Sequence, residues 1–197
     1  MQRTKSVTNS TRDTFNLELL LERLRNAAIK PDAAKAVRII LEQTVSDPAQ
    51  VISGMPEFEE NDVILFEDDT VSIWHSRFMP SVTVPAHDHK MSATIGVYRG
   101  SERNDLFEND PAGGIRISGK VELSAGDVLS IGPSAIHTVT CISDEPCCGI
   151  HVYLGNLSKV ERSLFDVNTG VTLPFTDENY NRLMCPADQS ILPPDQK

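Results

Sequence analysis

The sequence predicts an all-β protein, a sandwich or barrel of short strands, with a helical extension at its N-terminus. Most of the chain after residue 60 consists of short β-branched runs separated by turn residues. No segment between these runs is long enough for the helices that βαβ crossovers need, which argues against a parallel α/β fold. Only the first quarter of the chain has apolar residues at helical spacing.

Two helices are predicted ahead of the strands. The first covers residues 15–28, FNLELLLERLRNAA, and Asp13 or Asn16 can cap its start. Its apolar stripe consists of Leu17, Leu20, Leu21 and Leu24. The second covers residues 31–45, PDAAKAVRIILEQTV, with Pro31 in its first turn. A weak linker is expected around SDPAQVISGMP, before the first strand.

Nine short runs are predicted as strands. In chain order they are DVILFE, TVSIWHSRF, SVTVPAHDH, ATIGVYRG, GIRISG, KVELSA, DVLSIG, HTVTCIS and CGIHVYLG. The segment after them is rich in turn signals and proline, so we expect an ordered strap followed by a loose tail. The predicted divisions are a helical extension (1–55), a barrel (56–160), and the strap and tail (161–197).

Composition favours a protein that binds small molecules. The chain of 197 residues suits one main domain, and its formal net charge of -10 disfavours nucleic acid and anionic membranes as partners. Neither a secretory signal nor a membrane-spanning run is recognisable. The four cysteines, at positions 141, 147, 148 and 185, form no CxxC pair, which is typical of a reducing compartment. The sequence therefore predicts a cytoplasmic protein.

Three histidines stand out as candidate metal ligands. In VPAHDHKMSATIGVYRG, His87 and His89 point to one face of an extended strand while Asp88 points to the other. Downstream, GDVLSIGPSAIHTV places His137 at the start of another strand, after a turn at Gly126. In an all-β fold, strands far apart in the sequence come together, so these imidazoles can converge on one metal ion.

Together these two stretches resemble the two motifs of the cupin superfamily. The resemblance implies a single double-stranded β-helix, or jelly-roll barrel, with a metal bound by His87, His89 and His137. Ala93 stands where many cupins have a glutamate ligand, and Ser81 replaces the opening glycine of the first motif. Three neutral imidazoles leave a divalent metal with its full charge, so the site should favour anionic ligands; imidazole suits iron, nickel, copper and zinc alike.

A further stretch, CCGIHVYLGNL, is similar to the thiol dioxygenases, in particular to the cysteine dioxygenase branch. In that branch a Ser-x-His-x-Tyr strand places histidine and tyrosine beside the substrate, and His151 and Tyr153 match these two positions. The resemblance implies catalytic roles for both and iron(II), Fe(2+), as cofactor. Gly149 replaces the serine, and Thr94 stands where mammalian members carry a cysteine that crosslinks to tyrosine, so no such crosslink is expected.

The family also holds the substrate carboxylate with an arginine on a strand before the first motif. The matching position here falls near Ile64, in DVILFE, which contains no arginine. Two expectations follow. One is that the thiol needs no carboxylate, so that a carboxylate-free thiol such as cysteamine is turned over at little cost. The other is that another arginine, such as Arg77, binds the carboxylate.

The prediction is therefore an iron(II)-dependent dioxygenase that oxidises a small thiol to a sulfinic acid with O2, as a monomer or homodimer. Three alternatives stay open. One is a cupin dioxygenase that cleaves a carbon–carbon bond of a dicarbonyl or phenolic compound. Another is a zinc hydrolase or lyase, because three histidines and a water also describe that site. The last is a cupin that binds a small molecule without catalysis.

Overall fold

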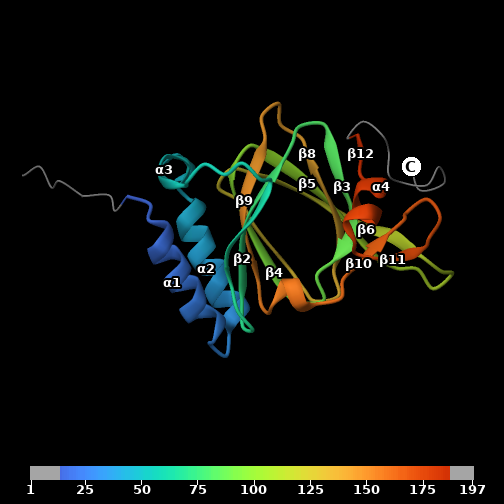
Figure 1. Cartoon of the computed structure of the whole chain (residues 1–197), viewed down its shortest axis with the longest axis horizontal. Helices are drawn as coiled ribbons and strands as arrows, with labels where there is room; N and C mark the ends of the chain where they lie inside the picture. The colour runs from blue at the N-terminus through green and yellow to red at the C-terminus, as the bar shows by residue number, and fades with distance from the viewer. Residues whose placement is uncertain (1–13, 187–197) are drawn as a thin grey trace, which may run out of the picture.

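The N-terminal helices form one layer beside the strands. The computed structural model describes residues 14–186, and in it α1 (Leu17–Ala28) and α2 (Ala33–Val45) cover one outer face of the sheets (Figure 1). The side chain of Asn16 caps α1 by accepting a hydrogen bond from the Leu19 amide at 2.9 Å. Asp13, the other predicted cap, lies outside the described residues. None of the described helices has the length and apolar character needed to cross a membrane.

The segment predicted as a linker contains a third helix. α3 (Pro48–Gly54) begins at proline, and the side chain of Asp47 caps it by accepting from the Gln50 amide. Proline is well suited to the first turn of a helix, because its missing N–H would have no partner there. The prediction of a weak linker was wrong here, because the short segment after Asp47 forms a capped helix that begins at proline.

Five strands form sheet A, in the order β1-β2-β9-β4-β7. They are β1 (Asp62–Glu67), β2 (Ser72–Phe78), β4 (Ala93–Arg99), β7 (Val128–Ile131) and β9 (Cys147–Tyr153). Their outer face packs on the helices, where Leu24 of α1, Leu41 of α2 and Ile73 of β2 are fully buried in one cluster. Gly96 lets α2 approach β4 closely, since a Cβ there would lie 3.2 Å from a methyl carbon of Val45.

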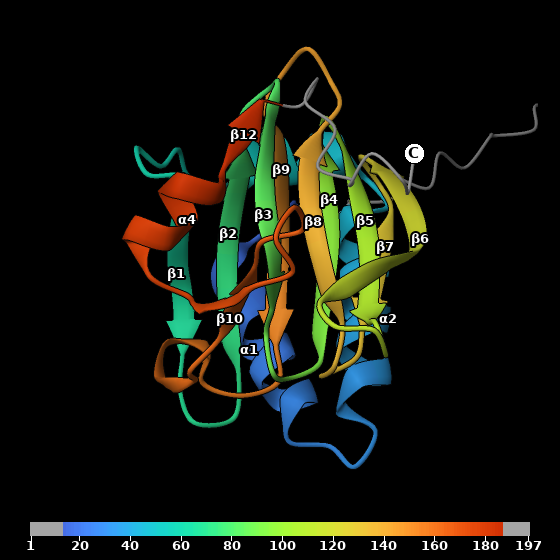
Figure 2. The same cartoon turned by 90° about the vertical axis from the view of Figure 1, so that its right-hand side faces the viewer.

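Sheet B faces sheet A across the barrel interior, as Figure 2 shows with sheet B in front. Its order is β11-β10-β3-β8-β5-β6, and β12 pairs with β3. The strands are β3 (Val82–Asp88), β5 (Ser101–Asn109), β6 (Ile115–Ser124), β8 (Ile136–Cys141), β10 (Ser163–Phe165), β11 (Thr172–Pro174) and β12 (Cys185–Pro186). Apolar side chains such as Ile95, Val97 and Leu123 fill part of the interior between the sheets.

The strand order confirms the predicted fold class, a double-stranded β-helix with an N-terminal helical extension. Along the chain from β2 to β9, every strand-to-strand connection crosses from one sheet to the other, except the one between β5 and β6. This alternation winds the chain around a single barrel, and every pairing is antiparallel. All nine predicted runs fall on strands, with GIRISG and KVELSA joined in one strand, β6.

One barrel strand, β5, was not predicted, and the three short strands β10, β11 and β12 were expected only as part of an ordered strap. The sequence of β5, SERNDLFEN, places Glu102 and Asn104 on the buried face, where both side chains are fully buried. Because strand prediction depends on apolar residues facing inward, a strand with a polar inner face gives no such signal. This polar inner face lies directly beside the histidine of β8.

The C-terminal strap forms one edge of sheet B. After the short η1 helix (Leu157–Lys159) it contains β10, β11 and α4 (Asp177–Leu183), and then β12. β10 pairs with the end of β3 that carries His87, through Leu164↔His87 and Phe165↔Ala86. The strap therefore lies against the candidate metal ligands. The predicted loose tail beyond residue 186 lies outside the described residues.

Candidate metal centre

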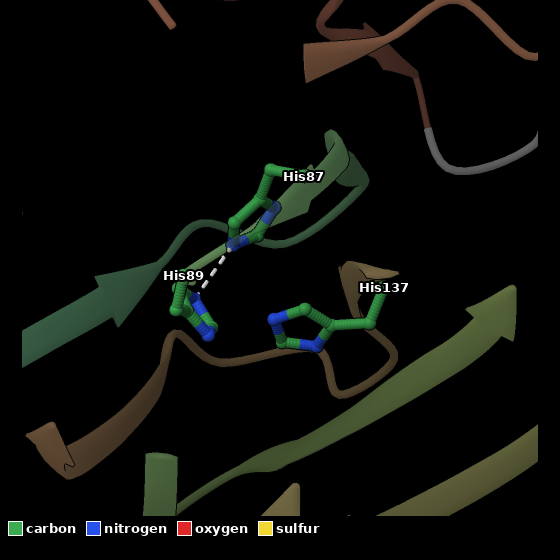
Figure 3. Close-up of side chains that lie close together, drawn as sticks. All are labelled: His87, His89 and His137. Carbon is green, nitrogen blue, oxygen red and sulfur yellow. Dashed lines mark hydrogen bonds between the residues drawn. The ribbon is translucent and has the colours of Figure 1, made fainter. Parts of the chain in front are cut away.

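Strands β3 and β8 bring the three candidate ligands together. His87 is the penultimate residue of β3, and it lies opposite His137 of β8 in the antiparallel register. His89 follows the strand directly, just before Lys90, whose backbone has a positive φ of 57° and turns the chain. The ligand nitrogens of all three imidazoles lie within 4.8 Å of one another, and the rings converge on one point (Figure 3).

Hydrogen bonds fix the orientation of two of these rings. His87 Nδ1 lies 2.8 Å from the Pro85 carbonyl oxygen, which can only accept, so Nδ1 carries the proton. His137 Nδ1 lies 2.8 Å from Oδ1 of Asn104 and donates to it in the same way. Both rings therefore direct an unprotonated Nε2 toward the shared point. Metal-binding histidines in general are oriented by a bond of this kind at the other ring nitrogen.

Burial keeps the three imidazoles neutral. It lowers the pKa of His87 to about 4, despite the opposing effect of its hydrogen bond to Pro85. Burial lowers the pKa of His89 and of His137 well below the usual value, and the neighbouring histidines lower it further. Neutral imidazole is the form that binds a metal ion.

The geometry fits a metal ion. His137 Nε2 is buried and has no hydrogen-bond partner among the described residues, a costly arrangement that a bound ion would relieve. The Nε2 atoms of His87 and His89 are 3.1 Å apart. Two imidazole nitrogens at about 2.1 Å from one ion and at right angles to each other would be about 3 Å apart. These residues would therefore hold the ion from one side and leave the cavity side open.

The three histidines line a cavity of about 300 Å³. His151 and Tyr153, which share a face of β9, line the same cavity. The ring of Tyr153 packs against that of His89, with 4.9 Å between centroids, and its hydroxyl lies 3.3 Å from His151 Nδ1. The remaining lining is partly apolar and aromatic: Trp74, Phe78, Val84, Val139, Leu157 and Phe175.

The His151–Tyr153 pair has two properties that bear on chemistry. Burial raises the pKa of the Tyr153 hydroxyl, so this group stays protonated and acts as a hydrogen-bond donor. Burial lowers the pKa of His151 to about 3, so its ring is neutral. His151 Nε2 is buried and has no hydrogen-bond partner within residues 14–186, and a Cβ on Gly149 would lie 3.1 Å from it. Gly149 thus leaves the His151 ring room that a larger side chain would crowd.

Arg77 does not reach this cavity. On β2, Trp74, Ser76 and Phe78 line the cavity, so Arg77 points to the opposite face because strand side chains alternate. Its guanidinium donates to the carbonyl oxygens of Phe58 and Glu59 at 3.1 and 2.7 Å, and holds the segment after α3. The suggestion that Arg77 binds substrate is therefore corrected: its partners are two backbone carbonyls and the side-chain oxygen of Asn61, all outside the barrel.

The arginine that lines the cavity is Arg162, which the sequence did not single out. It lies between η1 and β10, and its guanidinium stacks 3.9 Å above the ring of Phe175. Within residues 14–186 it takes part in none of the ion pairs. No motif spacing marks Arg162, because the strap that places it is irregular. The carboxylates of Asp62 and Asp88 interact with Arg162 electrostatically. Since neither forms an ion pair with it among the described residues, its guanidinium is available to bind an anion.

No protein-family model matches the chain. One similar solved structure is oxalate decarboxylase of Bacillus subtilis, described with Mn(II) centers, at 17% identity and a TM-score of 0.43; the match covers 59% of this chain and 31% of that one. Another is an uncharacterized conserved protein with a double-stranded beta-helix domain from Klebsiella pneumoniae, at 15% identity and a TM-score of 0.43, covering 58% of this chain and 93% of that one. The chain thus matches about a third of the length of oxalate decarboxylase.

Proposed function

We propose that the protein is an iron(II)-dependent dioxygenase that uses O2 to oxidise a small thiol to a sulfinic acid. One observation carries the proposal: a single cavity of about 300 Å³ is lined by three neutral histidines, Tyr153 and Arg162, together with the acidic residues Asp62 and Asp177. A metal with its full charge, a hydrogen-bond donor and a cation in one small space suit a small anionic substrate. The resemblance to thiol dioxygenases points to the same chemistry.

The three histidines are suited to a thiolate ligand. They contribute no negative charge, so an ion held by His87, His89 and His137 would attract anions more strongly than one with a carboxylate ligand. Bound iron(II) would supply the redox chemistry and the open coordination positions that a thiolate and O2 require. The histidines' own contribution is to hold three nitrogens in fixed directions before the substrate arrives.

The proposed reaction balances without a further reductant. The sulfur of a thiol loses four electrons when it becomes a sulfinic acid, and one O2 molecule accepts four. Both oxygen atoms end on the sulfur, and the thiol proton is matched by the acidic proton of the product. The cavity therefore needs to accommodate only the thiol and O2, which agrees with its volume of about 300 Å³.

Arg162 and Tyr153 would orient the substrate. A carboxylate on the thiol would bind the Arg162 guanidinium, whose planar fork matches two carboxylate oxygens. The Tyr153 hydroxyl, with His151 Nδ1 at 3.3 Å, would donate a hydrogen bond to the reacting atoms. Because Arg162 lines the cavity, we expect a thiol with a carboxylate to be preferred over cysteamine, in contrast to the expectation from Ile64.

The test is oxygen uptake by the iron(II)-loaded protein with three matched thiols. Cysteine carries a carboxylate and an amine, 3-mercaptopropionate carries only the carboxylate, and cysteamine carries only the amine. We expect one O2 consumed for each thiol, a sulfinic acid product identified by mass spectrometry, and a higher kcat/KM for the two carboxylated thiols.

Other outcomes would identify the alternative functions. Consumption of a dicarbonyl or phenolic compound with carbon–carbon cleavage, and none of thiols, would replace the proposal with the other dioxygenase reaction. Hydrolysis by the zinc-loaded protein without O2 would indicate a hydrolase or lyase. Tight binding of a small molecule without turnover under any of these conditions would indicate a binding protein.

A further inference from the structure

A chain of buried polar side chains runs from the candidate ligand His137 away from the cavity. His137 Nδ1 donates to Oδ1 of Asn104 at 2.8 Å, and Nδ2 of Asn104 donates to Oε1 of Glu102 at 2.9 Å. At the far end, the thiol of Cys147 donates to Oε2 of Glu102, with 3.4 Å between sulfur and oxygen. All four side chains are at most 1% exposed. We call these residues the His137 relay.

Every hydrogen bond of the relay is donated toward Glu102. The amide nitrogen of Asn104 can only donate, so its oxygen must face His137, and this fixes the proton on Nδ1 and the lone pair on Nε2. Burial raises the pKa of the Cys147 thiol, which keeps it a donor. Both oxygens of Glu102 accept hydrogen bonds, as the two oxygens of a carboxylate do.

Burial raises the pKa of Glu102, so a carboxylate with these partners needs an explanation. None of the ion pairs among the described residues involves Glu102, so its partners there are neutral. Burying a charge is costly unless an opposite charge offsets it. The relay leads from Glu102 through Asn104 to Nε2 of His137, the atom directed at the candidate metal position. A divalent ion at that position would provide the compensating charge.

We propose that Glu102, acting through Asn104, is a positioning residue that holds His137 in its metal-binding tautomer and increases the electron density on Nε2. The inference rests on the metal site of the proposed function but is independent of its substrate. Carboxylates linked to metal-binding histidines generally have this effect, and replacing such partners typically weakens metal binding by about 10- to 100-fold.

The test compares metal binding and redox potential in Glu102→Gln and the unsubstituted protein. Glutamine can still accept from Asn104 through its amide oxygen, so the substitution removes charge and keeps the hydrogen bond. We expect about 10-fold weaker Co(II) binding by titration. We also expect a higher Fe(III)/Fe(II) midpoint potential, because less electron density on His137 disfavours the ferric ion.

Asp105→Asn is the matched control. It removes a carboxylate directly after Asn104 on the same strand. Asp105 pairs with Arg103 at 3.1 Å and takes no part in the relay. This variant should bind Co(II) as the unsubstituted protein does and keep its potential. A shift of equal size in both variants would overturn the proposal, because it would show a general effect of charge.

Asn104→Ser provides a second route if Glu102→Gln does not fold. The shorter side chain interrupts the relay while Glu102 keeps its charge, and we expect the same two changes. Unchanged Co(II) affinity and potential in either relay variant would overturn the proposal. If the unsubstituted protein binds no Co(II) or iron, the metal site itself is wrong and the relay proposal fails with it, a result distinct from unchanged values in the variants.

Discussion

Tyr153 is the residue whose predicted role the geometry defines most closely. Its ring packs on His89 and its hydroxyl lies near His151, yet it belongs to neither cupin-like motif. We expect Tyr153→Phe to keep the apolar ring contact, and therefore the metal, while kcat falls by about 100-fold through loss of one oriented donor. Metal content measured by mass spectrometry, together with kcat for the best thiol, tests this. A variant with undiminished kcat would assign Tyr153 to packing alone.

Arg162 should determine which thiols are accepted. Arg162→Gln removes the guanidinium that would bind a carboxylate, so KM for 3-mercaptopropionate should rise by about 10- to 100-fold, as expected for one charge-assisted contact. Cysteamine, which has no carboxylate, should be little affected. The control is Arg99→Gln, since Arg99 lines a separate pocket on the outer face of sheet A. Equal losses with both thiols would argue against a carboxylate contact.

The C-terminal strap is the element that completes the cavity. Asp88, the central residue of His-Asp-His, points away from the ligands and accepts from the Ser163 amide at 2.9 Å. Its other oxygen pairs with Lys90 at 2.6 Å, and the side chain of Asp88 is almost fully buried. The residue between the two histidines therefore anchors β10, next to Arg162. Asp88 thus has a structural role between two histidines that face the candidate metal position.

Removal of this anchor should loosen the strap. In Asp88→Ala the Ser163 amide loses its acceptor, which should lower the free energy of unfolding by about 1–3 kcal/mol. Amide hydrogen exchange at Ser163–Phe165 should speed up more than exchange in the helices. Lys90→Asn is the control: it removes the ion pair, keeps the Ser163 hydrogen bond, and suits a residue with positive φ. Unchanged exchange in Asp88→Ala would show that β10 is held by its strand pairing alone.

Regular elements with apolar inner faces could be predicted from the sequence, and polar or irregular ones could not. The runs from DVILFE to CGIHVYLG were recognised because their burial follows their apolar residues. The five residues assigned to the metal and to catalysis all line one cavity, because local motifs placed them on strand faces. Arg162 was missed because it lies on an irregular strap, and Glu102 and Asn104 because their strand buries polar groups. Arg77 was misplaced because the alternation along β2 was not applied to it.

Across the whole molecule, all five histidines are buried. Burial lowers the pKa of His75 to about 4, that of His87 to about 4 and that of His151 to about 3. An unfolded chain binds protons at its histidines near pH 6.5, whereas the folded chain excludes them until much lower pH. The unfolded state therefore holds more protons between pH 6.5 and about 4, and acid in this range favours unfolding.

The stability of the metal-free protein should accordingly fall as the pH drops from 7 to 5. For each histidine that the fold keeps unprotonated, the free energy of unfolding falls by about 1.4 kcal/mol for each pH unit below 6.5. Glu102 partly opposes this fall, because burial raises its pKa. Chemical denaturation at several pH values measures the slope. His75 is the informative residue because it bonds to Tyr98 on the outer face of sheet A, away from the ligands. His75→Gln should reduce the slope of the unfolding free energy against pH by the equivalent of about one proton. An unchanged slope would contradict the lowered pKa of His75 in the folded protein.

The pairing of β2 with β9 and of β3 with β8 also has a kinetic consequence. Ser72 lies opposite Tyr153, and His87 lies opposite His137, so the cavity is assembled from segments far apart in the chain. Contacts of such long sequence separation form slowly, because a large loop must close before they contribute any stability. After refolding from denaturant, the helical signal should recover first. Capacity to bind Co(II) should return only with the slowest phase, as the last property of the native barrel to appear.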